Sequence, residues 1–195
     1  FINGAHTYTS AGFKTITLTV TDGAAQVASR TALIKVIASP THEERVNMAI
    51  EKGLLYLYNN QIISGEKTNW GSTDEYGTGA NGSTVLAFEE NGHLPGNNRV
   101  EDIYSETVQR GLNYLVAQAV TLGISNQAAG NPDTNGNGVG VWINHLAYGH
   151  CFTLSAIIMG YPNAAAAQAA LVPAGMGALA GSSFYRVAVD MMETL

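Results

Sequence analysis

One helical pattern occurs about twice along this chain, and it constrains the fold more than any other feature. Residues 51–61 read EKGLLYLYNNQ and residues 109–118 read QRGLNYLVAQ, so both contain Gly-Leu-x-Tyr-Leu followed by Gln. A glycine-rich loop and a helix of small residues follow each copy, within residues 69–95 and 148–162. Repeated helical hairpins bury their apolar faces by packing on one another. The chain is therefore predicted to form a stacked or ringed helical array instead of a single-core enzyme fold.

Charged residues are scarce. They make up 12% of the 195 residues, which is half the usual share of about 25%. Such a surface suits large protein–protein contacts, and a glycosylated secreted protein has a similar composition. The net charge of −6 argues against nucleic-acid binding, which needs a basic stripe. No apolar run reaches the ~20 residues of a membrane-spanning helix.

Cys151 is the single cysteine, so an internal disulfide is excluded while the redox compartment stays open. It adjoins His150 and lies six residues after His145, which are poor helical spacings for a shared zinc ligand set. We interpret Cys151 as a small core residue. The chain opens at Phe1 and stops inside a helical pattern at Leu195, so we expect it to be a piece of a longer protein.

The N-terminal segment has the two-residue period of a β-strand. Residues 15–21 alternate Thr with Ile16, Leu18 and Val20, and Asp22-Gly23 supplies a turn before a second apolar run at residues 32–37. Strands are predicted at 13–21 and 31–37. Two strands cannot bury one apolar face against each other, so we expect further strands from upstream residues or a neighbouring subunit to complete the hairpin. Packing on the chain's own helices is the alternative.

Helical periodicity covers residues 46–195. Thr41 and Glu44 directly after Pro40 form a capping box. Helices are predicted at about 46–60, 82–90, 102–120 and 145–159, with a short turn at 164–170 and a last helix capped by Ser182. Gly53 and Gly111 occupy matching places in the repeat and predict close helix contacts. The residues predicted to face inward are Val46, Ala49, Ile50, Leu54, Leu57, Val85, Leu86, Phe88, Val108, Leu112, Leu115, Val116, Ala119, Phe184, Val187, Ala188, Met191 and Leu195.

The sharpest local motif is Asp-Thr-Asn-Gly-Asn-Gly at residues 133–138. Asp133, Asn135 and Asn137 place side-chain oxygens at alternate positions, Gly138 permits the sharp turn, and Val139 offers a backbone carbonyl, as in a calcium loop. Asn144 stands where the full pattern requires a bidentate Glu. With one carboxylate the predicted calcium site is weak and suited to millimolar calcium. An Asx- and Gly-rich turn is the alternative.

Three further residues are candidates for a ligand pocket. Trp70 and Trp142 lie near the loops at one end of the helical pairs, with His145 close to Trp142 in sequence, and they could line a sugar or isoprenoid pocket. Ordinary packing is the alternative for both tryptophans. His93 follows a predicted helix end, where its imidazole can bond the last carbonyls.

The first part resembles a known extracellular domain. His6–Tyr8, Gly12 and Thr17–Gly23 resemble the last strands of a PKD (polycystic kidney disease) domain, an immunoglobulin-like sandwich found on extracellular proteins. That family usually carries Tyr two places after the Gly, where this chain has Lys14. The resemblance covers about residues 5–37, under half of such a domain. A generic β-hairpin is the alternative.

The second part resembles the prenyltransferase and squalene-cyclase repeat family, whose members form an α/α toroid. The matching segments are Ala49–Leu57 with Gln61, Trp70-Gly71, Thr78-Gly79, Leu86–Phe88, Gly92-His93 and Val108–Gln118. Cyclases of this family use an Asp-x-Asp-Asp acid or paired Asp, prenyltransferases use an Asp, Cys and His zinc site, and complement-type relatives carry a Gly-Cys-Gly-Glu-Gln thioester. None of these patterns occurs in the sequence.

These observations predict a multidomain α and β chain: a partial Ig-like β-sandwich hairpin at 1–38, a linker at 39–45 and a partial α/α toroid at 46–195. The expected function is a non-catalytic extracellular or cell-surface structural and interaction module, with protein partners or self-assembly by strand addition. The alternative is a toroid that acts on or binds a polysaccharide or isoprenoid, with its catalytic acids outside this stretch. Calcium is the only cofactor expected.

Overall fold

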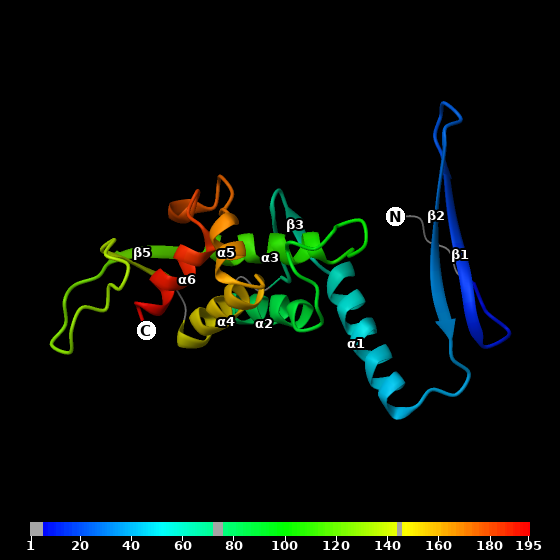
Figure 1. The fold of residues 1–195 in the computed structure, drawn as a ribbon, viewed down its shortest axis with the longest axis horizontal. Helices are drawn as coiled ribbons and strands as arrows, with labels where there is room; N and C mark the ends of the chain where they lie inside the picture. Colours follow the sequence, from blue (N-terminus) through cyan, green and yellow to red (C-terminus); the bar gives the residue numbers. More distant parts are fainter. Residues whose placement is uncertain (1–5, 72–75, 144–145) are drawn as a thin grey trace. The chain divides into compact units, whose positions relative to one another are not determined.

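The computed structural model describes residues 6–71, 76–143 and 146–195. Over these ranges the chain is a mixed α and β protein with six α-helices and three two-stranded antiparallel sheets (Figure 1). It divides into two compact units, Phe1–Glu51 and Lys52–Leu195. Within the described ranges, no helix combines the length and apolarity needed to cross a bilayer.

The first unit contains a long β-hairpin. Strand β1 (Gly12–Thr21) pairs antiparallel with β2 (Val27–Val36), and Ile16 lies opposite Ala32. The predicted turn is present, since the Asp22 carboxylate accepts the backbone N–H groups of Ala24 at 2.9 Å and Gln26 at 2.8 Å. Opposed residues of an antiparallel pair share a face. One face is therefore largely apolar, with Ile16, Leu18 and Val20, but it also carries Lys14 and Arg30. The other face is rich in threonine, with Thr19 and Ser29 hydrogen-bonded across it at 2.9 Å.

Helix α1 (His42–Asn59) begins in the first unit and ends in the second. Its N-terminus has the predicted capping box, because Thr41 N–H donates to the Glu44 carboxylate at 2.9 Å and Glu44 N–H donates to Thr41 Oγ1 at 3.2 Å. Lys35 Nζ lies 3.0 Å from the same carboxylate. These contacts fix where the helix starts after the linker.

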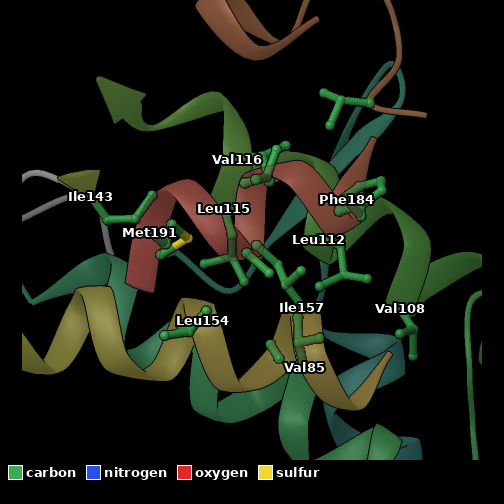
Figure 2. Packing of buried hydrophobic residues seen from close by; sticks show 14 of the residues in the cluster. Val85, Val108, Leu112, Leu115, Val116, Ile143, Leu154, Ile157, Phe184 and Met191 are labelled. Atoms are coloured by element: carbon green, nitrogen blue, oxygen red, sulfur yellow. The ribbon is translucent and has the colours of Figure 1, made fainter. Parts of the chain in front are cut away.

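The second unit is built from five helices and two short hairpins. Its helices are α2 (Gly77–Glu89), α3 (Ser105–Ala117), α4 (Leu146–Met159), α5 (Ala164–Ala169) and α6 (Phe184–Met192), with a 3-10 turn at Gly177–Leu179. Strand β3 (Ile62–Ser64) pairs with β4 (Lys67–Asn69), and β5 (Ala119–Gly123) pairs with β6 (Val139–Ile143). Side chains from α2, α3, α4, α6 and β6 meet in one core (Figure 2).

Helices α2 and α4 approach closely because glycines line their contact. A Cβ on Gly82 would lie 2.9 Å from Phe152 Cβ, and one on Gly79 would lie 3.0 Å from Tyr148 Cδ2. A side chain at either position would push the helices apart. The helix that follows each copy of the repeat, α2 or α4, is rich in small residues, and this explains how the two helices pack on each other.

The structure corrects several expectations about helix bounds. Residues 119 and 120 belong to β5, because the apolar alternation after Gln118 pairs with β6 instead of extending α3. Ser183 caps α6 in place of Ser182, and it accepts Arg186 N–H at 3.2 Å. Helix α2 starts five residues earlier than predicted.

Burial also departs from the prediction at some positions. Val46 and Ile50 are exposed, and so is Leu195. Gly53 is exposed as well, with no atom within 4 Å of an added Cβ, so the expected helix contact is wrong there. Cys151 is exposed and not a core residue. At Gly111 the expectation holds, because an added Cβ would lie 2.5 Å from Val85 Cγ2.

Candidate functional site

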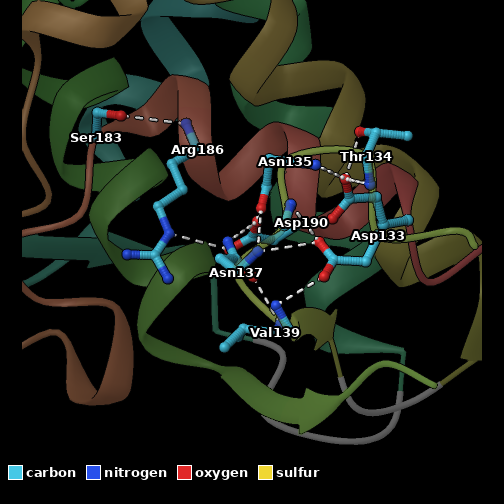
Figure 3. Close-up of polar contacts among 11 residues, drawn as sticks. Asp133, Thr134, Asn135, Asn137, Val139, Ser183, Arg186 and Asp190 are labelled. Carbon is cyan, nitrogen blue, oxygen red and sulfur yellow. Dashed lines mark hydrogen bonds and ion pairs between the residues drawn. The ribbon is translucent and has the colours of Figure 1, made fainter.

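The loop at residues 133–139 folds as a tight cradle around the Asp133 carboxylate (Figure 3). Asp133 Oδ1 accepts Gly136 N–H at 2.8 Å, and Oδ2 accepts Gly138 N–H at 2.9 Å. Asn135 Oδ1 accepts Asn137 N–H at 3.1 Å, and Asn137 Oδ1 accepts Val139 N–H at 2.6 Å. Gly136 and Gly138 have φ of 72° and 68°, which glycine adopts at low cost. The residue spacing therefore produces a sequence of Asx turns.

Helix α6 anchors this loop by two acidic side chains. Asp190 is 2% exposed, and its Oδ1 accepts the side-chain amides of Asn135 at 2.7 Å and Asn137 at 2.8 Å. Its Oδ2 accepts Arg186 Nε at 3.3 Å. Glu193 Oε1 accepts the backbone N–H groups of Thr134 at 2.7 Å and Asn135 at 3.2 Å. These contacts were not foreseen, because Asp190 and Glu193 lie more than fifty residues from the loop.

The same oxygens would be the ligands of the predicted calcium ion. The structure brings the side chains of Asp133, Asn135 and Asn137 together, but backbone amides already occupy each of their Oδ1 atoms. Val139 contributes its N–H to the cradle. Among the described residues, no group of three or more His, Cys, Asp or Glu side chains is arranged to hold a metal. A carboxylate and two carboxamides fit weak calcium binding, which stays a prediction.

Trp142 lies on β6 at the wall of an open hollow of about 850 Å³. The hollow is also lined by the carboxamide residues Asn126, Gln127 and Asn131, and by Glu193. The Trp142 ring stacks on His150, with ring centroids 4.5 Å apart at 23°. An aromatic ring beside several carboxamides is a chemical environment suited to the apolar faces and hydroxyls of a sugar.

His150 holds the back of this wall in place. The side chain is fully buried, its Nδ1 accepts Ile143 N–H at 3.3 Å, and its Nε2 donates to the Met191 carbonyl at 3.0 Å. Burial lowers the pKa of His150, and the hydrogen bond to Met191 opposes that shift in part. The ring is therefore neutral at pH 7, with its proton on Nε2. It links β6, α4 and α6 and has no metal-ligand role here.

Trp70, the other described pocket candidate, does not line the hollow at Trp142. Trp70 is structural, since its Nε1–H donates to Leu57 O at 2.8 Å and its backbone N–H donates to Asn81 at 2.8 Å. His145 lies outside the described residues. His93 bonds Asp102 at 3.0 Å by its side chain, so the predicted bond from its imidazole to the helix carbonyls is wrong. Its backbone N–H bonds Phe88 O instead.

A buried acid at the end of α2 was missed from the sequence. Glu89 is 4% exposed, and burial raises its pKa to about 9. It directly follows the buried Phe88 and precedes the exposed Glu90, and its position after an apolar run was the only available signal. A carboxyl group that is neutral at pH 7 can donate a hydrogen bond, a property that active sites also use.

Comparison of the chain with family models, with curated proteins and with solved structures finds no match. Its function is therefore argued from its own residues.

Proposed function

We propose that this chain is a non-catalytic structural and interaction module of a larger exported or cell-surface protein, with a PKD-like β part followed by a partial α/α-toroid-like repeat region. The uncovered apolar face of the β1–β2 hairpin carries this proposal. Ile16, Leu18 and Val20 on that face are 42%, 51% and 46% exposed.

The energetics of the hairpin favour a covering partner. Burying an apolar side chain of this size contributes roughly 1.5–3 kcal/mol, and an isolated two-stranded hairpin is marginal in water. Within the described ranges no other strand pairs with the outer edges of β1 and β2, and such free edges accept further strands. The added strands come from upstream residues of the same protein or from a neighbouring subunit. Either source makes this unit a point of assembly.

The helical unit supports the repeat interpretation in a separate way. The two copies of the sequence pattern fall in α1 and α3, and the small-residue helices α2 and α4 that follow them pack on each other. Helix α4 has no charged residue, yet Phe152, Ile158 and Met159 are each at least 40% exposed. A helix that is apolar on all sides belongs in a packed interior. Further repeats of the same kind would cover this face in a complete array.

The test is association of the purified chain by sedimentation velocity over a range of concentrations. We expect concentration-dependent self-association, which Ile16→Glu abolishes because it places a charge on the apolar face, where Ile16 lies opposite Ala32. Thr17→Glu is the matched control, because it introduces the same charge on the opposite face of the same strand. A monodisperse monomer at all concentrations, or equal loss in both variants, would contradict strand addition through this face.

Glycan binding is a second candidate, favoured by the hollow at Trp142 and its carboxamide lining. It belongs to the alternative of a toroid that binds or acts on polysaccharides. For the isoprenoid side of that alternative, the described residues offer an apolar hollow of about 340 Å³ lined by Ile157, Tyr161 and Phe184. Affinity electrophoresis in gels that contain soluble polysaccharides tests glycan binding. We expect retardation that Trp142→Ala removes and Trp142→Phe keeps. Unretarded migration in every polysaccharide gel would exclude this function for the hollow at Trp142.

A further inference from the structure

Glu89 is the most unusual ionisable side chain of the second unit. Both of its carboxyl oxygens are buried and make no hydrogen bond to any residue in the described ranges. It packs against the end of α4, where a Cβ on Gly160 would lie 2.8 Å from Glu89 Oε1 and 3.1 Å from Leu112 Cδ1. The carboxyl group thus lies where α2, α3 and the end of α4 meet. An anion here would be removed from water without any hydrogen bond in exchange.

Among the residues that the structure describes, no neighbouring charge compensates for the burial of Glu89, and burial is the cause of its raised pKa. From the end of α4, Tyr161 presents a buried hydroxyl, and burial together with the charge of Glu89 raises the pKa of that tyrosine. On α3, Arg110 pairs with Glu106 at 2.7 Å. In the loop between α2 and α3, His93 pairs with Asp102 at 3.0 Å. The adjacent Glu90 is exposed and has the same charge sign as an ionised Glu89.

The position of Glu89 at the end of α2 also favours the protonated carboxyl group. Glu89 is the last residue of α2, where the unpaired carbonyls give the helix end a partial negative charge. This field disfavours a carboxylate and favours the protonated acid. The partial negative charge of the helix end therefore acts in the same direction as burial, because both favour the protonated form of Glu89.

We propose that Glu89 is a proton-controlled latch that keeps the C-terminal turn of α2 closed against α3 and the end of α4. In the closed state the carboxyl group carries its proton. On deprotonation the carboxyl O–H bond breaks, the proton passes to water or hydroxide, and the resulting carboxylate reaches solvent by opening of the last turn of α2.

The opening can stay local because the bonds of this turn join residues within 86–93, including those from Asn91 N–H to Phe88 O at 3.1 Å and from Asn91 Nδ2 to Ala87 O at 2.8 Å. Glu90 N–H bonds Leu86 O at 2.9 Å, Gly92 N–H bonds Glu89 O at 2.9 Å, and His93 N–H bonds Phe88 O at 3.1 Å. Phe88 is fully buried and anchors the helix one residue earlier. Local openings at helix ends require much less free energy than global unfolding.

Two measurements on the purified chain test the latch. The first follows the ¹³C chemical shift of the Glu89 carboxyl carbon with pH; we expect a midpoint several units above the ordinary glutamate value of 4.5. The second measures amide hydrogen exchange of residues 86–93, corrected for intrinsic rates. The Glu89 carboxyl titrates near its ordinary value of 4.5 in the open state and near 9 in the closed state. The equilibrium constant for opening should therefore rise about tenfold per pH unit between these two values, or about 100-fold from pH 6 to pH 8.

Glu89→Gln removes the titration while keeping the shape, so its exchange protection should be independent of pH over this range. Glu90→Gln is the matched control and should respond as the wild type does. A carboxyl midpoint below pH 6 would overturn the proposal, and it can be read from the wild type even where the Gln variant does not fold. Equal pH responses of wild type and Glu89→Gln would overturn it as well.

Discussion

Two glycines that occupy the same place in the sequence repeat have opposite environments, and this difference can be measured. At Gly111 an added Cβ would lie 2.5 Å from Val85 Cγ2 and 3.6 Å from two ring atoms of Trp70. Val85 is fully buried and β-branched, so it cannot rotate away cheaply. At Gly53 no atom lies within 4 Å. Alanine at the two positions should therefore change stability with opposite signs.

The magnitudes follow from packing and helix propensity. Replacing Gly by Ala in a helix contributes about 0.8–1 kcal/mol of stability, and this gain is uncompensated at Gly53. Overpacking at Gly111 costs about 1–3 kcal/mol, so after the gain in helix propensity Gly111→Ala should lower the free energy of unfolding by up to about 2 kcal/mol. In the double variant Gly111→Ala, Val85→Ala the new methyl occupies space that the valine methyls vacate. We expect a coupling energy of at least about 1 kcal/mol between the two substitutions.

The assay is urea unfolding followed by circular dichroism at 25 °C for the wild type, the three single variants and the double variant. Comparable m-values are required so that changes in midpoint report stability. The close contact between Gly111 and Val85 is refuted if Gly111→Ala stabilises the protein as much as Gly53→Ala does. This contact is also refuted if the effects of Gly111→Ala and Val85→Ala simply add, because the two side chains would then not touch.

Three further outcomes are expected. Calorimetric titration should detect weak, millimolar calcium binding to the wild type that Asp133→Ala abolishes; absent heats for both proteins would leave only a turn. His150→Phe should lower the free energy of unfolding by about 1–3 kcal/mol, because the Ile143 N–H loses its partner in the core; a change within about 0.5 kcal/mol in urea unfolding would contradict that role. Asn163→Ala should cost about 1 kcal/mol, because Asn163 caps α5 through Ala166 N–H; thermal unfolding would show this as a lower Tm.

Local signals in the sequence predicted the parts of the fold that local physics determines. The capping box at Thr41, the turn at Asp22 and the end of α4 before Gly160 and Pro162 depend on neighbours within a few residues, and each is observed. The buried stripe of α3 also follows from its helical period, as Val108 and Leu112 show. The two short hairpins were missed, because β3 and β4 have three residues each and Ala119–Gly123 continues the apolar pattern of a helix.

Long-range features could not be obtained in this way. The loop at Asp133 was recognised from its spacing, but its anchoring by Asp190 depends on contacts with Asn135 and Asn137, which lie 55 and 53 positions away. The same holds for Gly53 and Gly111: their sequence contexts agree, and only the packing of α2 on α3 distinguishes them. A periodic pattern indicates which face of a helix is apolar. It does not indicate which neighbour covers that face.

The pH dependence of global stability between pH 4.5 and 9 combines the shifted pKa values of Glu89 and His150, which act in opposite directions. The folded-state pKa of Glu89 is raised from 4.5 to about 9, so its contribution is fully present below pH 4.5 and is lost as the pH rises towards 9, by about 1.4 kcal/mol per unit. The folded-state pKa of His150 is lowered, so its contribution is present above the ordinary value of about 6.5 and is lost as the pH falls below it.

Below pH 6.5 the two slopes have opposite signs, so the loss from His150 opposes the gain from Glu89, whereas above pH 6.5 only the loss from Glu89 remains. Urea unfolding from pH 4.5 to 9 should therefore show a broad maximum on the acidic side and a decline above neutrality. In Glu89→Gln the decline should disappear and the acidic loss from His150 should become visible. If the wild type instead gains stability steadily from pH 6.5 to 9, Glu89 is ionised in the folded protein and the junction of α2, α3 and the end of α4 must provide it with a partner or with water.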